Sequence, residues 1–337
     1  MEYVQGKILT PEGFRSGYLG FENNTIVEAG KGNSPKKPIC KGFIVPTLVN
    51  AHTHVGDSFI KKKDIDLPKN VEELVAPPNG LKHKLLKEAS EKEIVDGMKN
   101  SIDKMVESGV SVFCDFRENG IKGINQLKNA LTNTKLSSII LSRPVKMEYN
   151  KDEINVLLEN SNGIGLSSIS DWNYSELARI AGHAKKKGKV FAIHASERIR
   201  EDIDLVLDLK PDLLIHMVKA NKSDLEIVKD NDIPIVVCPR SNNFFGLKTD
   251  LELFKKVGVK LILGTDNAMI NSPKILDEIT FIKNKYKCFS VEELLYMATY
   301  TARKALNHDS CILGLNQKAD FIVLDEKTLR PLYISVC

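Results

Sequence analysis

Residues 189–218 read KVFAIHASERIREDIDLVLDLKPDLLIHMV and carry the clearest indication of fold class. Two short apolar runs, at 189–196 and 212–218, flank a charged amphipathic segment. A short, continuously apolar run is typical of a parallel strand that helices cover on both faces. The stretch therefore predicts one β-α-β unit.

The same alternation of apolar runs and amphipathic segments recurs along most of the chain. We expect strands at 42–52, 109–116, 137–144, 163–170, 189–196, 212–218, 233–239 and 259–266. Eight strands separated by helices predict an α/β fold, specifically a (β/α)8 TIM barrel, with a doubly wound open sheet as the alternative. Three capping-box pairs predict helix starts. They are Ser90 with Glu93, Ser223 with Glu226, and Ser290 with Glu293.

Three regions depart from this alternation. Residues 1–41 and 312–337 hold short alternating segments between Gly, Asn and Pro, so we expect a small β-sandwich formed by both chain termini. Residues 42–311 would then form the barrel domain. The segment 57–90 is polar, Pro-rich and too long for an ordinary βα turn, which predicts a lid or wall of the active site.

Composition narrows the class of protein. The 337 residues are 42% hydrophobic and 27% charged, in the soluble globular range, with no apolar run long enough for a membrane span. The net charge of +4 is spread over helices, and the six cysteines form no CxxC pair. No secretory pattern opens the sequence. We expect a cytoplasmic protein with a small-molecule substrate and no nucleic-acid or membrane partner, and leave a homo-oligomer open.

Polar residues follow the predicted strands, at the barrel face where active sites gather. His52 and His54 are two residues apart, so on an extended strand both imidazoles point to the same side. With His194 and Asp266 they would complete an N3O set for one divalent metal, leaving a position for water. Two satisfied structural histidines are the alternative explanation for the His-x-His pair.

Three residues are candidates for proton transfer at this site. Asp266 could accept a proton from the water, Glu197 could shuttle protons, and His216 could bind the water or the anionic oxygen of the intermediate. The structural alternatives are a helix cap for Asp266, an N-terminal helix acid for Glu197 and a satisfied core histidine for His216.

Four further residues are candidates for substrate contact: His83, Arg117, Arg143 and Trp172. Trp172 could stack on a ring, and Arg143 could bind an anion or a carbonyl. A solvated position for His83 and a rim salt bridge for Arg143 are the alternatives. His183 and His308 are expected to be structural or surface groups.

Five motifs together resemble one known family. They are VPTLVNAHTH (45–54), IHASE (193–197), LLIHMVKA (213–220), VVCPRSN (236–242) and LGTDNAM (263–269), followed by the terminal segment NQKADFIVLDEKTLRP (316–331). The set resembles the amidohydrolase superfamily, in the branch that includes cytosine deaminase, guanine deaminase, S-adenosylhomocysteine/methylthioadenosine deaminase and the triazine hydrolases.

This resemblance implies a mononuclear zinc or iron site, with Glu197 and His216 in proton transfer and water positioning. The metal ligands it implies are His52, His54, His194 and Asp266. The implied reaction is hydrolytic deamination of an aminated, nucleobase-like heterocycle, a cyclic amidine, by metal-activated water. The fourth predicted strand lacks the lysine typical of binuclear members. A cyclic amide or chloro-triazine hydrolase on the same site and a non-catalytic binding protein are the alternatives.

Overall fold

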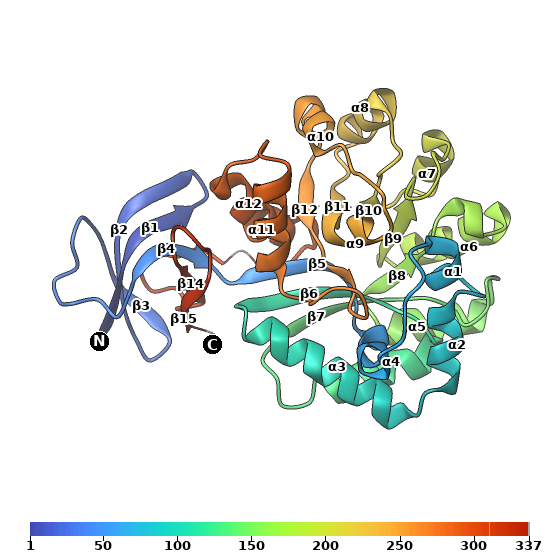
Figure 1. Cartoon of the computed structure of the whole chain (residues 1–337), viewed down its shortest axis with the longest axis horizontal. Coiled ribbons are helices and arrows are strands. Elements are labelled where there is room, and N and C mark those ends of the chain that lie inside the picture. Colours follow the sequence, from blue (N-terminus) through green and yellow to red (C-terminus); the bar gives the residue numbers. More distant parts are fainter. Residues whose placement is uncertain (310, 336–337) are drawn as a thin grey trace.

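The larger of two sheets in the computed structural model, which describes residues 1–309 and 311–335, has nine parallel strands (Figure 1). Its order, β12-β11-β10-β9-β8-β7-β6-β5-β13, places consecutive strands side by side over most of the sheet. The predicted α/β class is confirmed. Residues 336 and 337 of the predicted terminal segment 312–337 lie outside the described ranges. The strands are β5 (Leu48–His54), β6 (Val110–Arg117), β7 (Ser137–Ser142), β8 (Gly163–Leu166), β9 (Val190–Ala195), β10 (Leu213–His216), β11 (Ile235–Val237), β12 (Leu261–Leu263) and β13 (Asp266–Asn267).

The two edges of this sheet meet in the last predicted strand, 259–266. β12 pairs with β11, whereas β13 pairs with β5, and Gly264 and Thr265 alone separate β12 from β13. The Thr265 N–H donates to the carbonyl oxygen of His52 over 3.0 Å. A Cβ at position 264 would lie 2.6 Å from His52 Cβ, so only glycine allows this approach. The sheet is therefore curled, and residues from its two ends become neighbours.

Helices surround the curled sheet, with an amphipathic helix between most successive strands (Figure 1). Two predicted capping boxes, at Ser90 and Ser290, are confirmed. The third is wrong because α8 begins earlier, where Asn221 and Asp224 form the box instead. The helices are α3 (Glu91–Val106), α4 (Gly120–Ala130), α5 (Lys151–Asn160), α6 (Tyr174–Lys186), α7 (Ile203–Asp208), α8 (Lys222–Asp230), α9 (Pro239–Phe244), α10 (Leu251–Val257), α11 (Ile275–Lys285), α12 (Val291–Met297) and α13 (Tyr300–Ala305). A 3-10 turn spans Ile169–Asp171.

Both ends of the chain contribute to the second sheet, which lies beside the helices at the left of Figure 1. It has the order β15-β14-β4-β1-β2-β3 and a core that includes Val4, Ile44 and Phe321. The predicted strand 42–52 is two strands, because the chain passes from this sheet to the other after Pro46, which has no N–H. The strands are β1 (Glu2–Thr10), β2 (Gly13–Glu22), β3 (Thr25–Lys31), β4 (Lys41–Pro46), β14 (Phe321–Leu324) and β15 (Pro331–Ser335).

The segment between β5 and α3 packs against the parallel sheet through short helices. A 3-10 helix spans Val55–Lys63, followed by α1 (Val71–Leu74) and α2 (Leu81–Glu88). Phe59, Ile60 and Leu74 are buried in the main core, which anchors the first part and the middle of the segment. Within the described ranges, no helix has the length and apolar character needed to cross a membrane.

Candidate metal centre and active site

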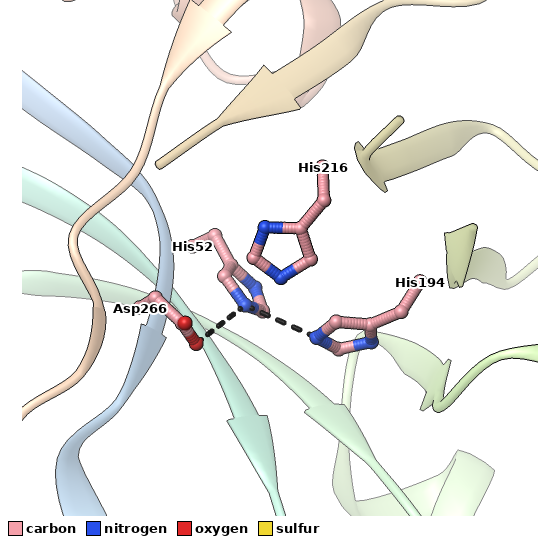
Figure 2. A group of neighbouring side chains, drawn as sticks. All are labelled: His52, His194, His216 and Asp266. Carbon is pink, nitrogen blue, oxygen red and sulfur yellow. Dashed lines mark hydrogen bonds and ion pairs between the residues drawn. The ribbon is translucent and has the colours of Figure 1, made fainter. Parts of the chain in front are cut away.

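Three imidazoles and one carboxylate come together where the parallel strands end (Figure 2). They belong to His52 on β5, His194 on β9, His216 on β10 and Asp266 on β13, and one ligand atom of each lies within 4.8 Å of the others. His52 Nε2 lies 3.3 Å from Asp266 Oδ1 and 3.3 Å from His194 Nε2. Curling of the sheet thus brings four distant parts of the sequence to one point.

Unusual backbone angles accompany these strand ends. His216, Met217 and Asp266 have φ values of 73°, 53° and 60°, and Ser196, just after β9, has 47°. This left-handed region is unfavourable for residues that carry a Cβ, and it persists where surrounding contacts hold it. The chain therefore turns sharply at or just after the residues that carry side chains into the cluster.

Hydrogen bonds determine which nitrogens of two histidines face the cluster with a lone pair. His194 Nδ1 lies 2.8 Å from the carbonyl oxygen of Leu166, which only accepts, so Nδ1 carries the proton. His54 Nδ1 donates to Glu118 Oε1 over 3.0 Å, and His54 Nε2 lies 3.6 Å from Asp266 Oδ1. Both Nε2 atoms are therefore free to bind a metal.

The ring of His216 has the opposite tautomer. Asn242 Nδ2 is a donor and lies 3.3 Å from His216 Nδ1, so the ring proton is on Nε2. The orientation of the Asn242 amide is supported by Thr249, whose hydroxyl donates to Asn242 Oδ1 over 3.2 Å. His216 thus presents a proton to the site, where His194 presents a lone pair.

Burial and neighbouring charges determine the ionisation of the cluster. Burial lowers the pKa of His52, His194 and His216, and lowers that of His54 to about 3, so the imidazoles are neutral. Burial alone would raise the pKa of Asp266, but the hydrogen bond from His52 and the neighbouring histidines hold it well below its usual value. Neutral imidazoles and an ionised carboxylate are the forms that bind metals.

The donor set fits a divalent cation. Nitrogen lone pairs of His54 and His194 and an ionised oxygen of Asp266 face one small space with His52. The other nitrogen of His52, Nδ1, is buried without a hydrogen-bond partner among the described residues, so Nε2 is its one polar contact with the site. Nitrogen lone pairs that face one another beside a carboxylate repel, and a cation placed between them removes this repulsion. Three nitrogens and one oxygen are a ligand set found in zinc sites.

The sequence of residues 43–335 matches the model of the amidohydrolase family. The chain belongs to the amidohydrolase family. The expected resemblance is thereby confirmed. An uncharacterized protein of Methanocaldococcus jannaschii is 40% identical over 79% of this chain and 74% of that protein. A 5-methylthioadenosine/S-adenosylhomocysteine deaminase of Caldicellulosiruptor saccharolyticus is 27% identical over 86% of this chain and 73% of that protein. The atrazine chlorohydrolase of Arthrobacter aurescens TC1, solved with zinc, has a TM-score of 0.74 at 14% identity, over 100% of this chain and 94% of that one.

This amidohydrolase has a cavity directly against the cluster. The segment 57–90 forms part of its wall with α1, α2 and the residues between them. Its lining combines cluster residues, acids, bases and apolar groups. They include His54, Val71, Val75, Pro77, Lys82, His83, Phe116, Arg117, Glu118, Arg143, His194, Glu197, His216 and Asp266.

Three of the four predicted substrate residues line this cavity. Arg143 has no ion-pair partner in the described part of the chain, whereas Arg117 is paired with Asp115 and Glu118. His83 Nε2 donates to a backbone carbonyl over 3.0 Å, which leaves Nδ1 as an acceptor. The fourth, Trp172, is absent from the residues that line the cavity: it is buried, and its Nε1 donates to a serine hydroxyl over 2.9 Å.

Glu197 stands at the edge of the cluster in a form that can donate a proton. Burial, together with the negative charge of Asp266, raises the pKa of Glu197 to about 8. Its Oε1 lies 3.3 Å from Asn242 Nδ2 and 3.5 Å from His216 Nε2. At neutral pH the carboxyl group is therefore mostly protonated.

The sequence pattern does not predict several contacts of the cluster. Ser241 Oγ donates to Asp266 Oδ2 over 2.5 Å, and Asn242 contacts both His216 and Glu197. Both residues lie in the motif VVCPRSN, which was recognised without a role for them. Lys82 is buried at the site, but it lies in a short helix of the segment 57–90, where no sequence pattern predicts this burial.

Proposed function

We propose that this amidohydrolase is a hydrolytic deaminase of an aminated heterocycle, a cyclic amidine of nucleobase type. The observation that carries the proposal is the cluster of neutral imidazoles and one carboxylate next to Glu197, whose pKa is about 8. Such a combination supplies both a metal site and an acid that is protonated at neutral pH. The deaminase named among the relatives supports the same reaction.

His52, His54, His194 and Asp266 would hold one divalent ion, zinc first and iron second. A bound ion of this kind supplies a Lewis acid that makes water a nucleophile near neutral pH. Zinc in the similar chlorohydrolase structure supports this choice. His216 is assigned outside the ligand set because its two ring nitrogens face Asn242 Nδ2 at 3.3 Å and Glu197 Oε1 at 3.5 Å.

The chain's own residues supply the proton transfers. Asp266 accepts the proton of the attacking water on a carboxylate oxygen. Glu197 donates its proton to the ring nitrogen next to the carbon under attack, as its raised pKa allows. The Nε2–H of His216 stabilises the oxygen that becomes anionic. The proton held by Asp266 then passes to the amino group, the C–N bond breaks and ammonia leaves as the carbonyl forms. The second proton of the attacking water returns to Glu197, so both carboxyl groups end as they began.

Two cavity residues would orient the ring. The guanidinium of Arg143 offers donors for a carbonyl or an anionic group, and His83 Nδ1 offers an acceptor for an N–H or O–H. Arg117 acts through Asp115 and Glu118, which occupy its guanidinium. Trp172 is buried and is absent from the residues that line the cavity, so its stacking role stays a prediction from the sequence.

Ammonia release tests the proposal. Zinc-loaded protein is assayed against nucleobases, aminated pterins and aminotriazines, and we expect turnover with at least one of them. His194→Ala should abolish turnover, while His183→Ala, on the outer helix α6, should leave it unchanged. Full turnover with normal zinc content in the His194→Ala variant would reject the assigned site.

Two rivals have distinct outcomes in the same experiment. A cyclic amide or chloro-triazine hydrolase on this site would open a ring or release chloride in place of ammonia, because pocket shape decides the leaving group. A non-catalytic binding protein would contain no metal when prepared without chelators. The chlorohydrolase among the similar structures makes chloride release the first rival to assay.

The finer description of the fold and setting belongs to the same proposal. We take the curled sheet to be a closed (β/α)8 TIM barrel, and the terminal strands to be its small β-sandwich. The domain boundary after residue 41 stays a prediction; the pairing of β4 with β1 and β14 supports placing it after Pro46. A cytoplasmic location and a homo-oligomer stay predictions from the sequence.

A further inference from the structure

Lys82 brings a buried positive charge from the segment 57–90 to the edge of the site. It lies in the first turn of α2, and its side chain is only 3% exposed. Its Nζ lies 2.6 Å from Glu118 Oε1, 3.0 Å from Asn267 Oδ1 and 3.6 Å from Asp57 Oδ2. One ammonium group therefore joins α2 to the residue that follows β6, to β13 and to the 3-10 helix.

Two of these contacts lead directly to proposed metal ligands. Glu118 Oε1, the atom that Lys82 contacts, also accepts the Nδ1–H of His54 over 3.0 Å. Asn267, whose Oδ1 accepts from Lys82, donates through Nδ2 to Asp266 Oδ1 over 2.9 Å. Lys82 thus orients both the carboxylate behind His54 and the amide beside Asp266.

Charge balance adds to this geometry. Glu118 is buried between two cations, Lys82 and Arg117. A buried carboxylate that loses one of two cations is poorly compensated and moves toward the cation that remains. That movement would alter the hydrogen bond to His54. A hydrogen-bond partner on the other ring nitrogen orients a metal-binding histidine and tunes its affinity for the metal.

We infer that Lys82 is a positioning residue of the metal site, which holds His54 and Asp266 in binding geometry through Glu118 and Asn267. The inference rests on the proposed function, since it requires that these residues bind a metal. It also gives the segment 57–90 a role beyond forming a wall of the cavity. The packing of α2 against the parallel sheet and the assembly of the metal site are therefore coupled through Lys82.

Zinc affinity tests the inference without any substrate. Metal-free protein is prepared by dialysis against a chelator, and the zinc dissociation constant is measured by competition with a chromophoric chelator. We expect Lys82→Met to raise this constant about 10- to 100-fold, the range known for partners of metal-binding histidines. Lys84→Met, at an exposed position of the same helix, should bind zinc as the parent does.

The double variant separates positioning from general damage. If Lys82 acts through Glu118, the effect of Lys82→Met must shrink in a Glu118→Gln background. Wild-type zinc affinity in Lys82→Met, or full additivity of the two changes, would overturn the inference. Should Lys82→Met fail to fold, Lys82→Gln, which removes the charge and keeps a polar side chain, is measured in its place: weakened zinc binding supports the inference and unchanged binding overturns it. Absence of zinc binding by the parent chain would instead reject the proposed function, and this inference with it.

Discussion

Glu278 on α11 should make the protein less stable as pH rises, and Glu278→Gln should remove that loss. The side chain is fully buried, and Oε1 accepts the backbone N–H of Arg240 over 2.7 Å. Oε2 has no hydrogen-bond partner among the described residues, and the nearest cationic atom, Arg240 Nη1, is 3.8 Å away. Burial raises the pKa of Glu278 to about 8.

The size and sign of the effect follow from this pKa. The folded state holds the proton up to a pH of about 8, while the unfolded chain releases it near 4.5, so stability falls as pH rises between these values. The full difference corresponds to roughly 5 kcal/mol as an upper limit, at about 1.4 kcal/mol per pH unit. Between pH 5 and pH 8, wild-type protein should lose about 3 kcal/mol relative to the glutamine variant.

Denaturant unfolding at pH 5, 6.5 and 8 measures the difference between the two proteins, in which contributions of all other groups cancel. Glutamine keeps the shape of the side chain and the acceptor for Arg240. Asp277→Asn, an exposed acid of the same helix within 3.9 Å of Arg240, is the matched control and should follow the wild type. Parallel pH profiles for wild type and Glu278→Gln would refute the reasoning.

Three further outcomes follow from the site. Glu197→Gln should lower kcat/KM for the identified substrate about 10²- to 10⁴-fold. The kcat/KM of the wild type should fall about tenfold from pH 7 to pH 9, because the protonated form of Glu197 is lost; a flat pH profile contradicts this assignment. Dialysis against a chelator should abolish turnover and lower the thermal midpoint, with zinc restoring both, and a midpoint independent of zinc would count against the site. Gly264→Ala should lower the free energy of unfolding by about 1–3 kcal/mol, because its Cβ would meet His52 Cβ at 2.6 Å and Cys238 Sγ at 3.0 Å; unchanged denaturant unfolding would disprove this contact.

Regular elements of this chain were predicted where local pattern and burial agree. Strands β6 to β11 each lie within or at most one residue beyond a predicted apolar run, since a strand covered on both faces needs such a run. The errors fall where local preference is ambiguous. Asn221 and Ser223 are both good N-caps, and packing selects the first.

The candidate site was predictable to the extent that strand ends share one face. His52, His194, His216 and Asp266 could be expected together because each follows an apolar strand. The separate roles of these residues could not be predicted. The tautomer of each histidine depends on hydrogen-bond partners that are distant in sequence, such as Leu166 and Asn242. The indole of Trp172 was expected in the cavity but packs into the core, because its orientation depends on contacts beyond the strand.

The amino-acid sequence by itself determined the strand and helix pattern of the larger domain and the kinds of side chain at the ends of its strands. Both follow from local periodicity and from order along a parallel sheet. Tertiary structure alone decided that Lys82, from the short helix α2, would contact Glu118 and Asn267 behind the site. Such contacts depend on how the long segment between β5 and α3 packs, and no local pattern encodes where its side chains lie.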